Sequence, residues 1–122
     1  MAVKDVTELT VYKKAYALAM QLFNASKQFP PEERYALTGQ IRRSSRSVCM
    51  NLREAWAKKR YPAHFVSKLT DCDGENSETA TSLDFARDCE YITVAEHGAL
   101  KACNAEVGRM LGAMINNPDK CC

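Results

Sequence analysis

The residues of this sequence that are best suited to bind a ligand lie in one segment, GQIRRSSRSVCMNLREAW, at positions 39–56. Between Arg42 and Ser47 the segment carries three arginines and three serines. Serine is a mediocre helix former because its hydroxyl competes for backbone hydrogen bonds. Guanidinium groups bind anionic oxygens, and hydroxyl groups both donate and accept hydrogen bonds. This composition indicates that the segment makes contacts beyond those that stabilise a helix.

The apolar residues of this segment recur every three or four positions, which is the spacing of one helix face. The resulting stripe predicts the side that packs into the core: Leu37, Ile41, Ser45, Val48, Leu52 and Ala55. One flank of the stripe combines amide, hydroxyl and charged groups, which suits a partly buried interface between copies of the chain. We expect this polar row to consist of Gln40, Arg43, Ser47, Asn51 and Glu54. The alternative is an ordinary solvated flank.

The opposite flank and the end of the segment are rich in arginine and lysine, which can neutralise the phosphates of RNA or DNA. We define this cationic flank by six residues: Arg42, Arg46, Arg53, Lys58, Lys59 and Arg60. The alternative is that basic and acidic segments pair, within the chain or between copies. Residues 34–60 carry eight basic residues against one acidic residue, and residues 71–90 carry seven acidic residues against one basic residue. Charge alone favours this pairing.

Residue types that perform catalysis or hold metals occur without the spacing that these functions need. The run DCDGENSE at 71–78 has glycine fourth, whereas an EF-hand calcium loop needs glycine sixth and glutamate twelfth. His64 and His97 lie far apart without paired cysteines, so they do not predict a zinc site. Cys89 lies between two acidic residues, which disfavour a reactive thiolate. We therefore expect no catalytic residue, metal or cofactor, and a metal-dependent enzyme is the least favoured alternative.

Proline residues and shifts in the apolar pattern divide the chain into four amphipathic segments, expected as helices at residues 7–28, 31–59, 62–89 and 94–116. Pro31 suits the first turn of the second helix, and Pro62 separates the second from the third. No strand-like alternation or hairpin dipeptide occurs. Helices of this length with short connections turn back on one another. The pattern predicts an all-α, antiparallel, up-down-up-down four-helix bundle in a single domain.

The overall composition is that of one globular domain. The chain has 122 residues, of which 46% are hydrophobic and 26% charged. Its formal net charge is only +2, so a basic surface can arise only where basic residues are concentrated on one part of the molecule. No run approaches the roughly 20 apolar residues of a membrane span, and charges interrupt the region where a secretion signal is apolar. We expect a cytoplasmic protein with no membrane partner and with buried, reduced cysteines: Cys49, Cys72, Cys89 and Cys103.

Three stretches carry a resemblance to a known family: FP before the second helical segment, QIRRSSRSVCMNLREAW within it, and GRMLGAMI near the end. They resemble the small four-helix bundle proteins encoded by intervening sequences of bacterial 23S ribosomal RNA genes, over the range Leu9 to Ile115. The most specific matches are Gln40, Arg42, Arg43, Ser47, Val48, Asn51, Leu52 and Glu54. The chain departs from the family pattern at Ala55, where glycine is usual, and at Cys49, where proline is frequent.

The resemblance implies an assembly as well as a fold. Members of the family are homo-oligomers, commonly ring-shaped pentamers, and are similar to accessory proteins of diversity-generating retroelements, which bind nucleic acid and a reverse transcriptase. With the cationic flank, the resemblance leads us to expect a non-enzymatic homo-oligomeric scaffold that binds RNA or DNA. A ring that binds another protein and no nucleic acid is the main alternative.

Overall fold

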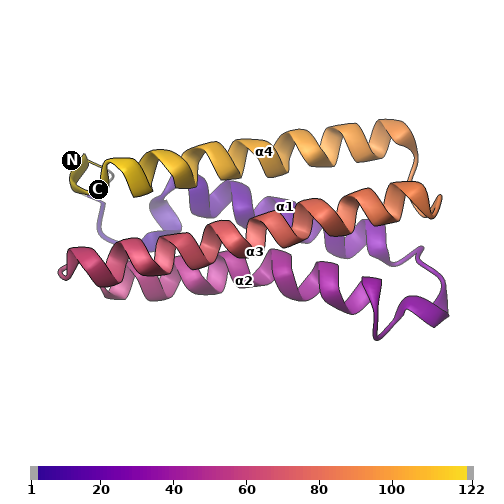
Figure 1. Ribbon diagram of the computed structural model, residues 1–122, viewed down its shortest axis with the longest axis horizontal. Helices are drawn as coiled ribbons and strands as arrows, with labels where there is room; N and C mark the ends of the chain where they lie inside the picture. Colours follow the sequence, from indigo (N-terminus) through magenta and orange to yellow (C-terminus); the bar gives the residue numbers. More distant parts are fainter. Residues whose placement is uncertain (1–2, 121–122) are drawn as a thin grey trace.

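Four long helices form most of the computed structural model, which describes residues 3–120. Their bounds are α1 Thr10–Ser26, α2 Leu37–Ala57, α3 Pro62–Asp88 and α4 Val94–Asn116. Consecutive helices run in opposite directions along the long axis (Figure 1), and α1 and α3 each pack against both α2 and α4. The predicted all-α, up-down-up-down four-helix bundle is thereby confirmed.

Short 3-10 turns lie outside the helices at Val6–Glu8, Pro31–Glu33 and Pro118–Lys120, and two of them displace predicted helix starts. α2 begins at Leu37 rather than at residue 31. Ala36 leaves helical geometry with φ −117° and ψ −106°, and the Glu33 carboxylate accepts a hydrogen bond from the Leu37 amide at 3.2 Å. α1 begins at Thr10 rather than at residue 7, because Leu9 is extended. The other bounds differ from the predicted ones by two residues or fewer.

Glu33 also ties the start of α2 to the connection between α3 and α4. The Tyr91 hydroxyl donates a hydrogen bond to Glu33 Oε2 at 2.8 Å, and this bond raises the pKa of Tyr91 to about 12. The Tyr91 ring packs on Phe29 with the ring centroids 5.4 Å apart. One carboxylate therefore closes this end of the bundle by accepting from a helix amide and from a tyrosine.

The core consists of two apolar clusters with a polar layer between them. Leu52, Leu69 and Leu111 belong to the first cluster, and Leu22 and Leu83 to the second. Along α2, α3 and α4, the stretch between the two clusters carries buried polar side chains instead. This polar layer consists of Ser44, Ser45, Asn76, Thr79 and Asn104.

Hydrogen bonds across the helix seams satisfy the polar layer. Asn76 Nδ2 donates to the Asn104 backbone carbonyl at 3.0 Å, and Asn104 Nδ2 donates to the Asn76 carbonyl at 2.9 Å and to Asn76 Oδ1 at 3.0 Å. The hydroxyl groups of Ser44 and Thr79 share a hydrogen bond of 2.8 Å. Among residues 3–120, no buried side-chain nitrogen or oxygen lacks a hydrogen-bond partner. A one-turn slip between helices would break this arrangement, so the layer favours one register.

The cysteines are less uniform than predicted. Cys49, Cys72, Cys89 and Cys103 are free, but only the first two are buried. Burial raises the pKa of the Cys49 thiol to about 11 and that of Cys72 to about 12, so both stay protonated and unreactive. The prediction of burial is wrong for Cys89, which is exposed just after the last residue of α3, and for Cys103, which is partly exposed. Cys121 and Cys122 lie outside the described residues.

Asn104→Ala tests the polar layer. We expect this substitution to lower the free energy of unfolding by about 1–3 kcal/mol, because it leaves the buried Asn76 Oδ1 without its donor, while Asn76 Nδ2 keeps its bond to the backbone carbonyl of residue 104. Urea unfolding followed by circular dichroism measures the change. Asn24→Ala, an exposed asparagine on α1, is the matched control and should change stability by less than about 0.5 kcal/mol. Equal effects of the two substitutions would mean that the buried pair has no special role.

Candidate functional site

The two surfaces predicted on α2 face different seams of the bundle, because α2 packs between α1 and α3. On the cationic flank, Arg42 contacts Phe23 of α1. On the polar row, Arg43 contacts Glu75 of α3. The arginines of the flank that lie within α2 and the polar row are therefore on different sides of one helix, whereas the rest of the flank lies beyond the last residue of α2, Ala57.

The polar row follows the seam between α2 and α3, and its charged members bind α3. Arg43 lies 3.3 Å from Glu75 Oε2 and 3.4 Å from Glu78 Oε2, while Glu54 accepts a hydrogen bond from Lys68 at 2.8 Å. Between them, Asn51 Nδ2 donates to the carbonyl and hydroxyl oxygens of Ser47, both at 3.0 Å. The amide and hydroxyl groups of the row are half-buried within one chain, and its ion pairs lie at the surface.

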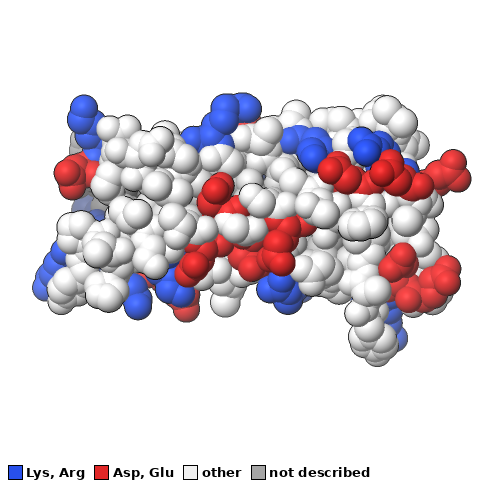
Figure 2. Space-filling view, in the orientation of Figure 1, with Lys and Arg blue, Asp and Glu red and all other residues white. Residues whose placement is uncertain are grey.

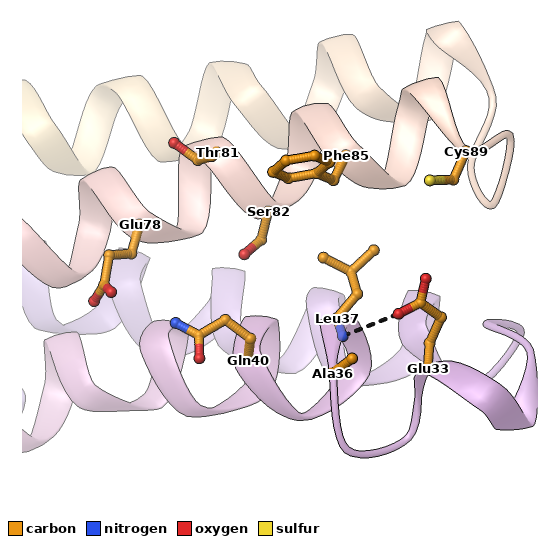
Figure 3. Close-up of a pocket in the computed structure, with 9 residues that line it drawn as sticks. All are labelled: Glu33, Ala36, Leu37, Gln40, Glu78, Thr81, Ser82, Phe85 and Cys89. Carbon is orange, nitrogen blue, oxygen red and sulfur yellow. Dashed lines mark hydrogen bonds between the residues drawn. The ribbon is translucent and has the colours of Figure 1, made fainter.

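An open groove of about 460 Å³ continues the polar row toward the start of α2. Figure 3 shows Leu37 and Phe85 facing each other across it, with Gln40 and Glu78 at one end and Glu33 at the other. Phe85 is 58% exposed although it lies within a long helix of the bundle. The groove adds an exposed apolar surface to a row that is otherwise polar.

Aromatic side chains of α1 hold several side chains of the cationic flank in place. The Arg42 guanidinium lies 4.8 Å from the Phe23 ring centroid and donates from Nε to the Ser26 hydroxyl at 2.8 Å. Arg46 lies 5.6 Å from the same ring. Farther along α2, Arg53 lies 5.9 Å from the Tyr12 ring. An arginine stacked on a ring keeps its N–H edge free for an anionic partner.

The basic and acidic segments pair as predicted at Arg43, which contacts Glu75 and Glu78 of α3. Among residues 3–120, no side chain of the cationic flank forms an ion pair. Arg42 is half-buried, and the other five residues of the flank are exposed. Figure 2 shows Asp and Glu gathered along the middle of α3, on the seam that the flank does not face. The cationic flank therefore presents five exposed charges, of which two lie beside α1 and three follow the end of α2.

A cavity of about 260 Å³ lies within the cationic flank, between α1 and α2. Its lining combines aromatic, thioether and guanidinium groups: Tyr12, Tyr16, Met20, Arg46, Met50 and Arg53. The cavity was not predicted from the sequence, because ligand-binding residues were expected only in the segment that forms α2 and the residues that follow it. The signal was present, since Tyr12, Tyr16 and Met20 are spaced by four residues and so share one helix face.

The seam between α3 and α4 contains a histidine and carboxylate pair. Asp84 Oδ1 accepts from His97 Nε2 at 2.8 Å and from Lys101 Nζ at 3.0 Å. The bond from His97, followed by that from Lys101, lowers the pKa of the Asp84 carboxyl. No hydroxyl or thiol hydrogen-bonds to His97 among the described residues. Because Asp84 lies on α3 and both His97 and Lys101 lie on α4, the cluster ties these two helices together.

Neither a metal-binding cluster nor a bilayer-crossing helix is found within residues 3–120. No three His, Cys, Asp or Glu side chains lie together there in a way that suits a metal ion. None of the helices combines the length and the apolar character needed to cross a bilayer.

Comparison with known proteins identifies a protein family and a similar solved structure. The family model described as 23S rRNA-intervening sequence protein matches residues 7–113. A crystal structure of a Bacteroides thetaiotaomicron protein of unknown function, from the S23 ribosomal protein family, superposes with a TM-score of 0.80. Its sequence is 28% identical, and the match covers 88% of this chain and 96% of that one. No curated protein matches the chain.

Asp84→Asn tests the tie between α3 and α4. The pKa of the Asp84 carboxyl is lower in the folded chain than its ordinary value of about 3.9. The charged carboxylate therefore stabilises the fold at pH values above about 3.9, and this stabilisation is lost as the pH falls through the pKa of the folded state. We expect Asp84→Asn to cost up to about 1 kcal/mol at neutral pH, since the side chain is partly exposed. The deficit should shrink on acidification in urea unfolding. Asp73→Asn, on the same helix, is the control, and an equal pH dependence in both variants would contradict the assignment.

Proposed function

The chain belongs to the 23S rRNA-intervening sequence protein family, and from this premise we propose that it is a non-enzymatic homo-oligomeric scaffold that binds nucleic acid. The observation that carries the proposal is the state of the cationic flank, whose five exposed charges have no ion-pair partner among residues 3–120. Arg46 and Arg53 lie on the α1 side of α2, and the other three follow the end of that helix. Isolated cations favour contact with phosphates, because binding then releases condensed counterions.

Self-association through the polar row would support this function, because each added copy of the chain adds another cationic flank to the assembly. We propose that the row and the adjoining groove form the contact between copies, with Phe85 supplying an apolar anchor and Gln40 supplying hydrogen bonds. Because Arg46 and Arg53 lie on the other side of α2, assembly through the row would leave them accessible. A ring, which we propose to be a pentamer, would present one flank per subunit, and a formal charge of +2 per chain would not prevent several phosphates from binding at once.

A ring that binds protein and no nucleic acid is the second candidate. The acidic band of α3 (Figure 2) favours it, because the cationic flank of one copy placed against the band of another would be neutralised inside the assembly. The two candidates differ in whether the flank is exposed in the oligomer. We propose a cytoplasmic location for both candidates, in keeping with the four cysteines among residues 3–120, which are all free.

The double substitution Arg46→Glu/Arg53→Glu tests nucleic-acid binding. We expect it to weaken binding of RNA or DNA and to reduce the slope of log affinity against log salt by about 0.7–0.9 for each phosphate that the variant no longer neutralises. Fluorescence anisotropy at several salt concentrations measures both quantities. Arg34→Glu/Arg109→Glu makes the same change in net charge at exposed sites outside the flank and should leave the slope unchanged. Absence of wild-type binding at low salt would favour the protein-binding ring.

Phe85→Asp tests the contact between copies. Light scattering of the wild-type chain should give a multiple of the 13.7 kDa subunit mass. We expect the substitution to shift the mass toward a single subunit, because it places a charge in an apolar contact. Val94→Asp, at an exposed apolar residue of α4, is the control and should preserve the oligomer. A wild-type mass of 13.7 kDa at micromolar concentration would reject the assembly, and an unchanged mass in Phe85→Asp would reject this interface.

A further inference from the structure

The cavity between α1 and α2 has features that phosphate binding alone does not use. Three large apolar side chains around it are exposed: Tyr16 at 54%, Met20 at 46% and Met50 at 68%. The fold does not require them, because α1 packs on the core through other residues, among them Ala15 and Leu18. These side chains surround one cavity and lie beside arginines that form no ion pair among the described residues. The cavity therefore suits a ligand with one apolar part and one anionic part.

The charged side of the cavity is held in place by aromatic rings. Arg53 lies over Tyr12, and Arg46 lies over Phe23, at centroid distances of 5.9 and 5.6 Å. No acidic side chain lines the cavity among the residues that the structure describes. The Tyr12 and Tyr16 rings are 6.1 Å apart and tilted by 32°, so Tyr16 offers a ring face that Arg53 does not occupy. The lining therefore provides an aromatic face, two flexible thioethers and two arginines.

We propose that this cavity takes one unpaired base of a single-stranded nucleic acid, which stacks on Tyr16 between Met20 and Met50 while Arg46 and Arg53 bind the flanking phosphates. The inference rests on the proposed binding of nucleic acid by the cationic flank. A volume of about 260 Å³ lies below the roughly 300–1,000 Å³ of sites for drug-sized ligands, so it suits one ring system. Every base has an aromatic face, so recognition is independent of sequence.

A duplex cannot use the cavity, because its bases are already stacked and paired. A duplex offers the flank phosphates alone, whereas a single strand can place a base in the cavity as well. Stacking of one base on an aromatic side chain changes affinity by a factor of roughly 5 to 150. The structure therefore predicts a preference for single strands that depends on Tyr16, in addition to the salt-dependent attraction common to both forms.

The test compares three probes by fluorescence anisotropy with the intact protein. They are a single strand of about 12 nucleotides without self-complementarity, the same strand annealed to its complement, and a strand of the same length that is abasic at every position. We expect the intact single strand to bind at least about fivefold more tightly than the abasic strand, which keeps the phosphates but has no base to stack. The duplex should bind like the abasic strand.

Substitutions around the cavity test whether the tighter binding of the intact single strand depends on the cavity. Tyr16→Ala and Met50→Ala should each weaken binding of the intact strand without changing the salt slope, because neither removes a phosphate contact. Tyr16→Phe keeps the ring and should retain affinity. Tyr35→Ala, at a tyrosine that is 90% exposed outside the cavity, should bind like wild type. Both alanine sites in the cavity are exposed, so thermal unfolding should show intact bundles.

Several outcomes would overturn the inference. If all three probes bind equally and Tyr16→Ala has no effect, while Arg46→Glu/Arg53→Glu still weakens binding, the flank binds phosphates and the cavity takes no base. If Tyr16→Ala alters the oligomer mass and leaves affinity unchanged, the cavity is a contact between copies. If no probe binds at low salt, the proposed nucleic-acid function fails and this inference fails with it.

Discussion

The reciprocal hydrogen bonds between Asn76 and Asn104, together with the bond between Ser44 and Thr79, constrain how α2, α3 and α4 fit together. Apolar layers tolerate small shifts along a helix, whereas buried amides and hydroxyls must meet particular partners. A satisfied polar pair contributes modestly to stability but strongly favours one register, as buried asparagines do in coiled coils. Gly108 accommodates the pair, because a Cβ there would lie 3.3 Å from Asn76 Nδ2.

This register sets the rotation of α2 and thereby the surfaces of the molecule. With Ser44 and Ser45 buried, Arg43 lies against the carboxylates of α3 and Arg42 lies against Phe23 of α1. Rotation of α2 by one residue, about 100°, would move the arginines away from both partners. The serines that are unfavourable for an isolated helix are thus explained in part by the core, where a small hydroxyl fills a narrow seam and finds a partner.

The aromatic residues of α1 restrict the movement of the arginines of the cationic flank. Contacts between a cation and a ring are worth about 0.5–1 kcal/mol at exposed sites, which is enough to restrict an arginine without burying its charge. Arg42, Arg46 and Arg53 are each held by a ring of α1, and they line one side of the helix without an ion pair among the described residues. A surface ordered in this way loses less conformational entropy on binding than one of free lysines.

The sequence by itself determined the fold class, the four helices and most of the apolar stripe of α2, because periodicity and proline positions are local properties. Family membership also followed from local residues such as Gln40, Asn51 and Glu54. Tertiary structure decided what periodicity cannot encode: that Ser44 and Cys49 are buried, that Arg43 pairs with Glu75, and that Tyr12 and Tyr16 of α1 meet the arginines of α2. Such contacts depend on the rotation of each helix about its axis. That rotation is fixed by side chains on neighbouring helices, which lie far away in the sequence.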